Sequence, residues 1–471
     1  MALRKRRRVH QESLFIATQS LARAPGHPFY ERLNALFAQH GFDDFAEGRC
    51  APYYTVNTGR PSIPPGVYFR MLMIGYFEGL ASERGIDWRV ADSLSLRHFL
   101  GYTLTESTPD HSTLSRTRSR LPVEVHDEVF EWVLAVLAKE GLLKGKTVSV
   151  DGTTLEANAA LRSLVRRDTG EDYRTYLEGL AHAAGIDTPT RQDLARIDKG
   201  RKRKASNQDW QHPHVPDAQV SKMKDGRTHL AHKAEHVVDL ETQAVLAVQL
   251  SPADQGDTQT LEASLAQAQG HLAGVAQQSA VASQLAPGGL QEVVADKGYN
   301  SNDTLTALQQ EGLRTYISEP ERRRRRWQEK AEAQAAVYAN RRRCRGQRGR
   351  ALQRLRAEYT ERSFAHTLET GALRRVFLRG QANIYKRLCI HAGAFNLGLV
   401  MRRRFGAGSP RGLHALWGAL HALWAALVGL YAPMTACGGR LAAAGRVCAT
   451  YLLLVVCRST GSPELRISTG C

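Results

Sequence analysis

The 471-residue chain is short of acidic residues, has few cysteines and shows no leader-like segment. Its 46 Asp and Glu residues face 64 Lys and Arg residues, and the net charge of +18 favours a polyanionic partner such as nucleic acid over a surface charged only for solubility. The seven cysteines include no CxxC pair, which excludes a zinc-binding pattern and indicates reduced, intracellular thiols. No apolar core follows the basic residues at 4–8, so we expect no secretory signal.

Hydrophobic periodicity divides the chain into a helical part and a mixed part. Between residues 25 and 140, apolar residues recur at spacings of three and four, which predicts helices. From Thr147 onward, β-branched residues predict strands at 147–150, 232–239, 244–250 and 292–295. Residues with high helix propensity predict helices at 258–269 and 302–310. This alternation predicts an α/β fold with a mixed sheet. We therefore expect a basic arm at 1–24, a helical domain at 25–140, a mixed α/β domain at 141–405 and an apolar tail at 406–471.

Three acidic residues stand out by their surroundings. Asp151 and Asp296 each follow an apolar, strand-like stretch, and Glu361 lies in a helix-like stretch further on. Acids that are distant in sequence suit a site assembled by folding, because neighbouring residues of one strand point to opposite faces. Three convergent carboxylates can hold two divalent cations, which can cut and join DNA. Taken alone, an aspartate after a strand is more often a helix cap or a turn residue.

Basic residues gather in three places. Insertions at about 160–230 and 320–355 interrupt the predicted sheet, and the stretch after Asp110 carries Arg116, Arg118 and Arg120. Blocks of like charge are commonly solvated segments, but insertions on both sides of the acidic residues also suit contacts to DNA phosphates. The stretch after Asp110 is either a helix that touches phosphate or a capped surface helix.

The tail differs in composition from the rest of the chain. Residues 413–432 carry no charge and repeat the sequence His-Ala-Leu-Trp at 414 and 421. Such a length could span a bilayer, but a buried or self-associating helix fits a strongly basic chain better. The role of residues 413–457 stays open.

Several sequence blocks resemble the bacterial insertion-sequence transposases of the DDE type. They include Val150-Asp-Gly-Thr, Ala295-Asp-Lys-Gly-Tyr-Asn-Ser, Glu361-Arg-Ser-Phe-Ala-His and Phe395-Asn-Leu-Gly-Leu-Val-Met-Arg. The N-terminal region with Ser107-Thr-Pro-Asp-His-Ser-Thr-Leu resembles the helical domain that precedes the catalytic domain in this family. The resemblance covers most of residues 25–412 and implies an RNase H-like catalytic domain.

The resemblance also implies roles for the three acids. Asp151, Asp296 and Glu361 would be the catalytic residues and the metal ligands, with Asp151 bridging two Mg²⁺ ions, for which Mn²⁺ could substitute. Relatives often carry a basic residue seven positions after the glutamate, where this chain has Leu368. Glu358 and Glu369 are therefore the alternatives to Glu361.

The implied function is binding of the element's terminal inverted repeats, followed by metal-dependent cleavage and strand transfer. The expected partners are double-stranded DNA, as element ends and target, and a second copy of the chain on that DNA. We expect a cytoplasmic, nucleoid-associated protein without a membrane partner. Two alternatives stay open: a catalytically decayed DNA-binding protein of a mobile element, and a metal-dependent nuclease without strand transfer.

Overall fold

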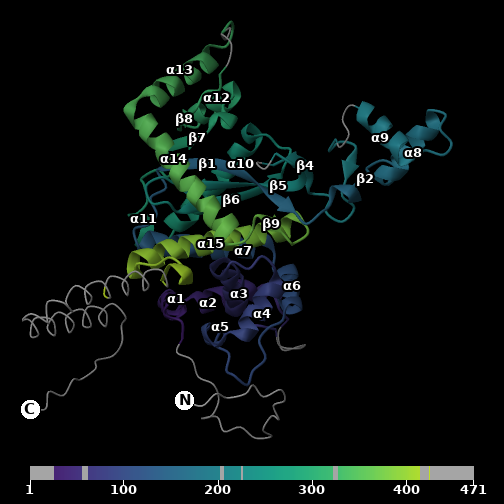
Figure 1. The fold of residues 1–471 in the computed structure, drawn as a ribbon. Helices are drawn as coiled ribbons and strands as arrows, with labels where there is room; N and C mark the ends of the chain where they lie inside the picture. Colours follow the sequence, from purple (N-terminus) through teal and green to yellow (C-terminus); the bar gives the residue numbers. More distant parts are fainter. Residues whose placement is uncertain are drawn as a thin grey trace, which may run out of the picture. The chain divides into compact units, whose positions relative to one another are not determined.

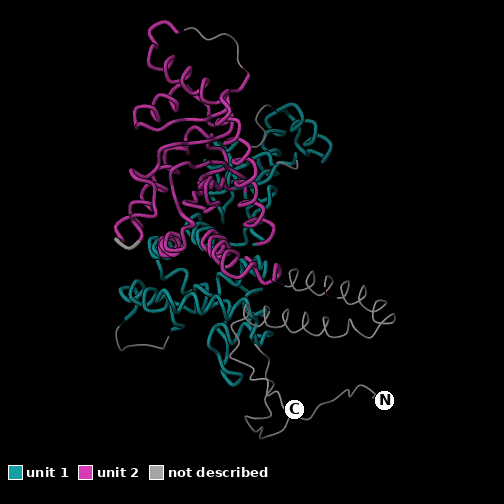
Figure 2. Tube along the Cα trace, turned by 90° about the vertical axis from the view of Figure 1, so that its left-hand side faces the viewer, with its two compact units in different colours: residues 1–129, 155–231, 371–391 teal, residues 130–154, 232–370, 392–471 magenta. Residues whose placement is uncertain are grey.

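The computed structural model describes residues 26–55, 62–201, 206–223, 226–321, 327–413 and Trp424, and Figure 1 shows the course of the chain. The expected basic arm, the arginines at 322–326 and almost all of the apolar tail thus lie outside the described residues. The chain divides into two compact units, coloured separately in Figure 2. Unit 1 comprises residues 1–129, 155–231 and 371–391, and unit 2 comprises residues 130–154, 232–370 and 392–471.

The N-terminal region is helical, as its periodicity predicts. Aromatic residues supply its core: Phe29 contacts Phe77 edge-on with ring centroids 4.9 Å apart, and Phe37 stacks on Phe42 at 4.7 Å. Such contacts favour burial of several helices against one another. The helices are α1 (Pro28–Gln39), α2 (Phe42–Cys50), α3 (Pro65–Glu78), α4 (Glu83–Asp92), α5 (Leu94–Phe99), α6 (His111–Arg120) and α7 (Val123–Lys139).

Unit 1 also contains part of the first basic insertion as a folded module. Trp210 is buried in a small apolar cluster of this module. Arg166 and Arg201 lie over the Tyr176 ring at 4.8 and 4.9 Å, so two of the basic side chains pack on an aromatic ring. The elements are β2 (Val165–Arg166), α8 (Tyr173–Ala183), α9 (Arg191–Gly200), β3 (Trp210–Gln211) and β4 (Gln219–Lys222).

The sheet of the mixed part has both parallel and antiparallel pairs, which confirms the predicted fold class. Its strand order is β4-β5-β1-β7-β8, with β6 beside β5 and β9 beside the end of β1. β7 pairs in parallel with β1 and β8, whereas β5 is antiparallel to β6. The strands are β1 (Thr147–Ala157), β5 (Thr228–Asp239), β6 (Val245–Pro252), β7 (Glu292–Ala295), β8 (Arg314–Ile317) and β9 (Arg375–Val376).

Helices cover both faces of the sheet in unit 2. Leu352 of α14 packs with Val294 and Tyr316 on one face. Ser264 of α10 hydrogen bonds Glu235 of β5, while the next residue along β5, His236, contacts α14; strand neighbours point to opposite faces, so α10 covers the other face. The helices are α10 (Asp257–Ala276), α11 (Ser279–Ala282), α12 (Asn302–Gln310), α13 (Ala331–Arg345), α14 (Gln347–Ala365) and α15 (Gln381–Phe405), of which α15 begins in unit 1.

The described residues also show the state of their cysteines and the character of their longer helices. The three cysteines that the structure describes, Cys50, Cys344 and Cys389, are free. Within the described ranges, no helix combines the length and the apolar character that a bilayer crossing requires.

Candidate active site

Asp151 and Asp296 lie next to the last pair of residues that joins β1 to β7, which is Val150 with Ala295. Asp296 directly follows β7, whereas Asp151 lies within β1, because that strand continues to Ala157 and does not end before the aspartate as its apolar run predicts. Adjacent strands are about 4.8 Å apart, and residues at the same register step point to the same face. Folding therefore brings together two carboxylates that are far apart in the sequence.

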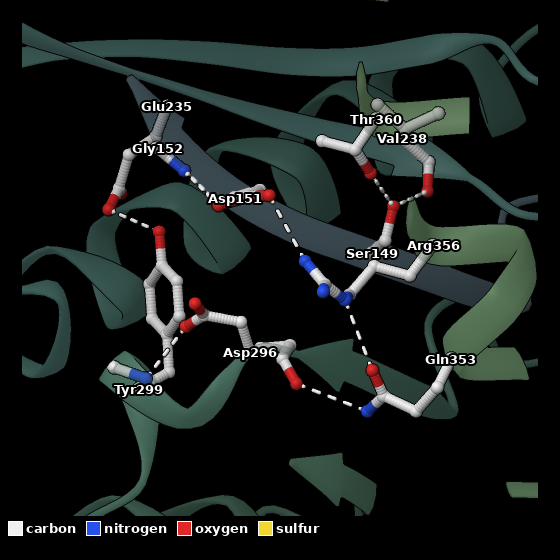
Figure 3. A network of polar contacts seen from close by, with 12 residues as sticks. Ser149, Asp151, Gly152, Glu235, Val238, Asp296, Tyr299, Gln353, Arg356 and Thr360 are labelled. Atoms are coloured by element: carbon white, nitrogen blue, oxygen red, sulfur yellow. Dashed lines mark hydrogen bonds and ion pairs between the residues drawn. The ribbon is translucent and has the colours of Figure 1, made fainter. Parts of the chain in front are cut away.

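Helix α14 lies over the face of the sheet that carries Asp151 (Figure 3). Ser149, two residues earlier on β1, hydrogen bonds the Thr360 hydroxyl at 2.8 Å. One turn earlier on α14, Arg356 Nη1 donates a hydrogen bond to Asp151 Oδ2 at 3.0 Å. Residues two apart on a strand share a face, which explains why one helix contacts both positions of β1.

Gln353 attaches α14 to the carboxyl ends of β7 and β8. Its Nε2 donates to the carbonyl oxygens of Ala295 at 3.2 Å and Tyr316 at 2.6 Å, and its Oε1 accepts from Arg356 Nε at 3.1 Å. Ala295 directly precedes Asp296. Gln353 therefore links the strand that precedes Asp296 to Arg356, the arginine that pairs with Asp151.

The two aspartates differ in electrostatic surroundings. Asp151 Oδ1 accepts from the Gly152 backbone N–H at 2.9 Å, and Oδ2 pairs with Arg356. Asp296 Oδ1 accepts from the Gly298 N–H at 2.7 Å, which caps a short 3₁₀ turn. Among the residues that the structure describes, Asp296 forms no ion pair. Within the described ranges, a cationic side chain thus pairs with Asp151 and none pairs with Asp296.

On the opposite face of the sheet, Glu235 of β5 is a buried acid with four polar neighbours. Glu235 is 1% exposed and accepts hydrogen bonds from Thr260 at 2.5 Å, Ser264 at 2.6 Å and Tyr299 at 2.8 Å. Lys233 Nζ lies 2.9 Å from Glu235 Oε1 and donates to the Thr260 hydroxyl at 2.8 Å. Burial and the nearby Glu235 carboxylate raise the pKa of Tyr299, so its hydroxyl stays protonated and donates. The carboxylate is fully engaged and has a structural role.

Lys233 reaches a second carboxylate near the site. Its Nζ lies 2.7 Å from Asp257 Oδ1 at the start of α10. The other Asp257 oxygen lies against Gly298, where an added Cβ would overlap with it and also approach Asp296 Oδ1. Gly298 therefore has no side chain because two carboxylates of the protein occupy that space.

Gly152 is constrained in the same way. A Cβ at this position would lie 3.1 Å from Lys233 Cε and 3.4 Å from the Tyr299 hydroxyl. Glycine in the two Asp-containing blocks could also suit a close approach of DNA backbone. At Gly152 the structure gives a direct reason for glycine, because the side chains of Lys233 and Tyr299 pack against this position.

Glu361 lies on α14 next to the residues that contact the sheet, but its side chain is exposed. Successive helix residues point about 100° apart, so Glu361 does not share the direction of Thr360. Thr360 contacts Ser149 of β1, so the exposed Glu361 side chain points away from this contact with the sheet. Of the alternatives, Glu358 pairs with Arg362 at 2.6 Å, and Glu369 is exposed in a π-helical turn after α14.

The carboxylate oxygens of Asp151 and Asp296 are of the ligand type that divalent cations prefer. Mg²⁺ and Mn²⁺ prefer carboxylate oxygens and are commonly held by one or two protein carboxylates plus water and substrate phosphate. Asp151 and Asp296 provide two such groups on one face. No group of three or more His, Cys, Asp and Glu residues suited to a metal occurs among the described residues, so a third protein ligand requires a movement of α14 or of a neighbouring side chain.

Packing of α14 on the sheet depends on a neutral histidine. The His236 ring stacks on Phe364 with centroids 4.2 Å apart and hydrogen bonds Ser363 at 3.0 Å. Complete burial lowers the pKa of His236 to about 3. The folded state therefore resists protonation, while the unfolded state takes up a proton below the ordinary pKa of about 6.5.

We expect acid to destabilise the protein through His236. As pH falls below about 6.5 towards 3, this residue lowers the free energy of unfolding by about 1.4 kcal/mol per pH unit. Denaturant unfolding at about pH 7 and about pH 5 checks this, with His236→Gln as the comparison. The wild type should lose more stability than the variant between the two pH values. Equal losses would contradict the assignment.

The basic helix predicted after Asp110 is α6, and its arginines have different roles. Asp110 Oδ1 caps the helix by accepting from the Thr113 N–H at 2.6 Å, and hydrogen bonds from Thr113 lower the pKa of the Asp110 carboxyl to about 2. Arg118 is buried and pairs with Glu83, so it serves the fold. Arg116 and Arg120 line a cavity of about 480 Å³ in unit 1, where they are available to an anionic ligand.

Sequence inspection alone missed four residues of the site: Lys233, Glu235, Gln353 and Arg356. Two of them had a signal, since Lys233 and Glu235 interrupt a stretch that predicts a buried strand, and buried charges are usually paired. Gln353 and Arg356 had none, because they lie among many arginines of a long polar helix.

Comparison with known protein families gives two matches. Residues 19–120 match the family described as "Transposase domain (DUF772)", and residues 203–397 match the family described as "Transposase DDE domain". The second match contains Asp296 and Glu361 and begins after Asp151. Searches of curated proteins and of solved structures found no match.

Proposed function

Because the chain belongs to the insertion-sequence transposases of the DDE type, which are metal-dependent enzymes that cut DNA and transfer its strands, we propose that it binds the terminal inverted repeats of its own element, cleaves there and joins the ends to target DNA. The observation that carries this proposal is the register of β1 and β7, which places Asp151 and Asp296 side by side on one face. Carboxylates in this position suit the binding of Mg²⁺, with Mn²⁺ as a substitute.

When bound, divalent cations would supply an activated water or 3′ hydroxyl and would stabilise charge on the leaving oxygen. The residues of the chain hold and orient these groups. Asp151 and Asp296 provide the carboxylate oxygens, and we propose Glu361 as the third acid, because it lies on the helix that contacts Asp151. For Glu361 to join them, α14 must rotate or its end must rearrange, and the π-helical turn at His366–Thr370 directly follows this segment.

We assign recognition of the element ends to the helical region at 25–140. Arg116 and Arg120 beside the cavity of unit 1 support this role, since phosphate contacts come mainly from Arg and Lys side chains and from helix N-termini. The domain limits of 25–140 and 141–405 are part of the same proposal. Cleavage at two element ends requires two active sites or two successive reactions, so we propose a homodimer on DNA.

A strand-transfer assay tests the proposed function. Duplexes that carry either precut or uncut element ends are incubated with supercoiled target DNA and the full chain, with Mg²⁺, with Mn²⁺ or with EDTA. We expect joined products with either metal and none with EDTA. Cleavage of uncut ends without any joining would indicate a nuclease, and end binding that persists in EDTA with no reaction under either metal would indicate a decayed DNA-binding protein. Both results would contradict the proposal.

A further inference from the structure

Asp151 and Asp296 differ in the charge of their neighbours. Arg356 Nη1 lies 3.0 Å from Asp151 Oδ2, and the two side chains are 17% and 27% exposed. Asp296 has no cationic partner among the described residues. Partial burial weakens screening by water, so the Asp151–Arg356 attraction is stronger than that of an exposed pair.

Gln353 fixes the position of the Arg356 side chain. Arg356 Nε donates to Gln353 Oε1 at 3.1 Å, and Gln353 is itself fixed to the carbonyl oxygens of Ala295 and Tyr316. The Nη2 group has no hydrogen-bond partner within the described ranges. The guanidinium is thus aimed at Asp151 and keeps free donors that could bind another oxygen.

A metal and this guanidinium cannot share the same carboxylate oxygen at low cost. Mg²⁺ binds carboxylate oxygens at about 2.1 Å, so a cation on Asp151 Oδ2 would lie within a few ångströms of the positive charge on Arg356. Release of the guanidinium requires another anion to take it. A DNA phosphate suits this purpose, because the planar fork of donors matches phosphate oxygens.

We propose that Arg356 is an internal counter-cation that restrains metal binding at Asp151 until a DNA phosphate takes over its guanidinium. DNA and metal then load together, and the chain avoids holding reactive metal without substrate. This inference rests on the proposed function, since it assumes that Asp151 is a metal ligand. In this scheme Arg356 acts on the metal through Asp151, and after its release it contacts a phosphate of the DNA substrate.

The experiment measures Mn²⁺ affinity of the full chain by calorimetry, with and without a precut end duplex. Arg356→Gln should bind Mn²⁺ about tenfold more tightly than the wild type without DNA, and the duplex should raise affinity about tenfold in the wild type and little in the variant. Arg356→Lys keeps the charge and should resemble the wild type. Arg354→Gln is the matched control, since Arg354 is exposed two residues away on the same helix. Thermal unfolding establishes that each variant is folded.

The outcomes separate the possibilities. Unchanged or weaker Mn²⁺ binding by Arg356→Gln would overturn the inference. Equal changes in Arg356→Gln and Arg356→Lys would also overturn it, because they would indicate loosened packing of α14 and not a loss of charge. If Asp151→Asn leaves both Mn²⁺ binding and cleavage intact, the assignment of Asp151 as a metal ligand fails, and the inference about Arg356 fails with it. If Asp151→Asn abolishes both while Arg356→Gln behaves as wild type, only the inference about Arg356 fails; if the wild type neither cleaves nor joins end DNA with either metal, the proposed function itself fails.

Discussion

Asp151→Asn and Asp296→Asn should each lower the single-turnover rate of DNA end cleavage about a thousandfold or more. An amide is a much weaker ligand than a carboxylate, so each change removes one of the two carboxylates that we propose as metal ligands, at adjacent positions of β1 and β7. Loss of metal removes several kcal/mol of transition-state stabilisation, and each 1.4 kcal/mol corresponds to a factor of ten in rate. The measurement is cleavage of a labelled end duplex with enzyme in excess over DNA.

Asp303→Asn provides the matched control for this pair. Asp303 is an exposed acid in the first turn of α12, seven residues after Asp296, and its change should leave the rate within about twofold, because surface substitutions away from a site have small effects. A normal rate in Asp296→Asn, or an equal loss in Asp303→Asn, would remove the special role assigned to Asp296.

Lys233→Met should lower the free energy of unfolding by about 3–5 kcal/mol, because loss of one partner of a buried ion pair leaves the other charge uncompensated. Lys233 is 6% exposed and Glu235 is 1% exposed, and Nζ lies within 3 Å of carboxylate oxygens of both Glu235 and Asp257. After the change, the Glu235 carboxylate keeps its three hydroxyl donors but loses its counter-cation. Equilibrium denaturation with urea measures the effect.

Two variants show whether the stability loss comes from the buried charge. Arg174→Met removes an exposed partner of Glu178 on α8 and should cost about 0.5 kcal/mol or less. The double variant Lys233→Met with Glu235→Gln should recover part of the loss, since it removes the unpaired charge. A double variant less stable than Lys233→Met alone would show that hydrogen bonds to the Glu235 carboxylate outweigh its charge.

The sequence predicts those parts of the fold that depend on local pattern. The predicted strand at 292–295 and helix at 302–310 coincide with β7 and α12, where a short apolar run and a capped helical pattern are both clear. β1 continues past its predicted end at residue 150 to Ala157, and β5 begins at Thr228, before its predicted start at residue 232. In both cases, pairing with neighbouring strands extends the strand past its apolar centre. β8 was missed, since its four residues begin with Arg314 and owe their strand conformation to pairing with β7.

The site was predictable only in part, for a similar reason. Asp151 and Asp296 each follow an apolar run that predicts a strand, and these two runs pair as β1 and β7, so their proximity follows from local signals. The continuation of β1 to Ala157, which places Asp151 within the strand, does not follow from them. The contact of Arg356 with Asp151 depends on which face of α14 packs on the sheet, and the polar, arginine-rich sequence of that helix does not define this face. The placement of Glu361 depends on the same packing, and its role as the third acid stays a prediction.

The central claim is that the Asp151 carboxylate beside Asp296 is needed for metal-dependent DNA cleavage. The most direct measurement is the single-turnover cleavage rate of Asp151→Asn with Mg²⁺, beside the wild type and Asp303→Asn, all three verified as folded by thermal unfolding. We predict a rate about a thousandfold lower for Asp151→Asn and near wild type for Asp303→Asn. A folded Asp151→Asn protein that cleaves end-containing DNA at the wild-type rate would contradict the claim.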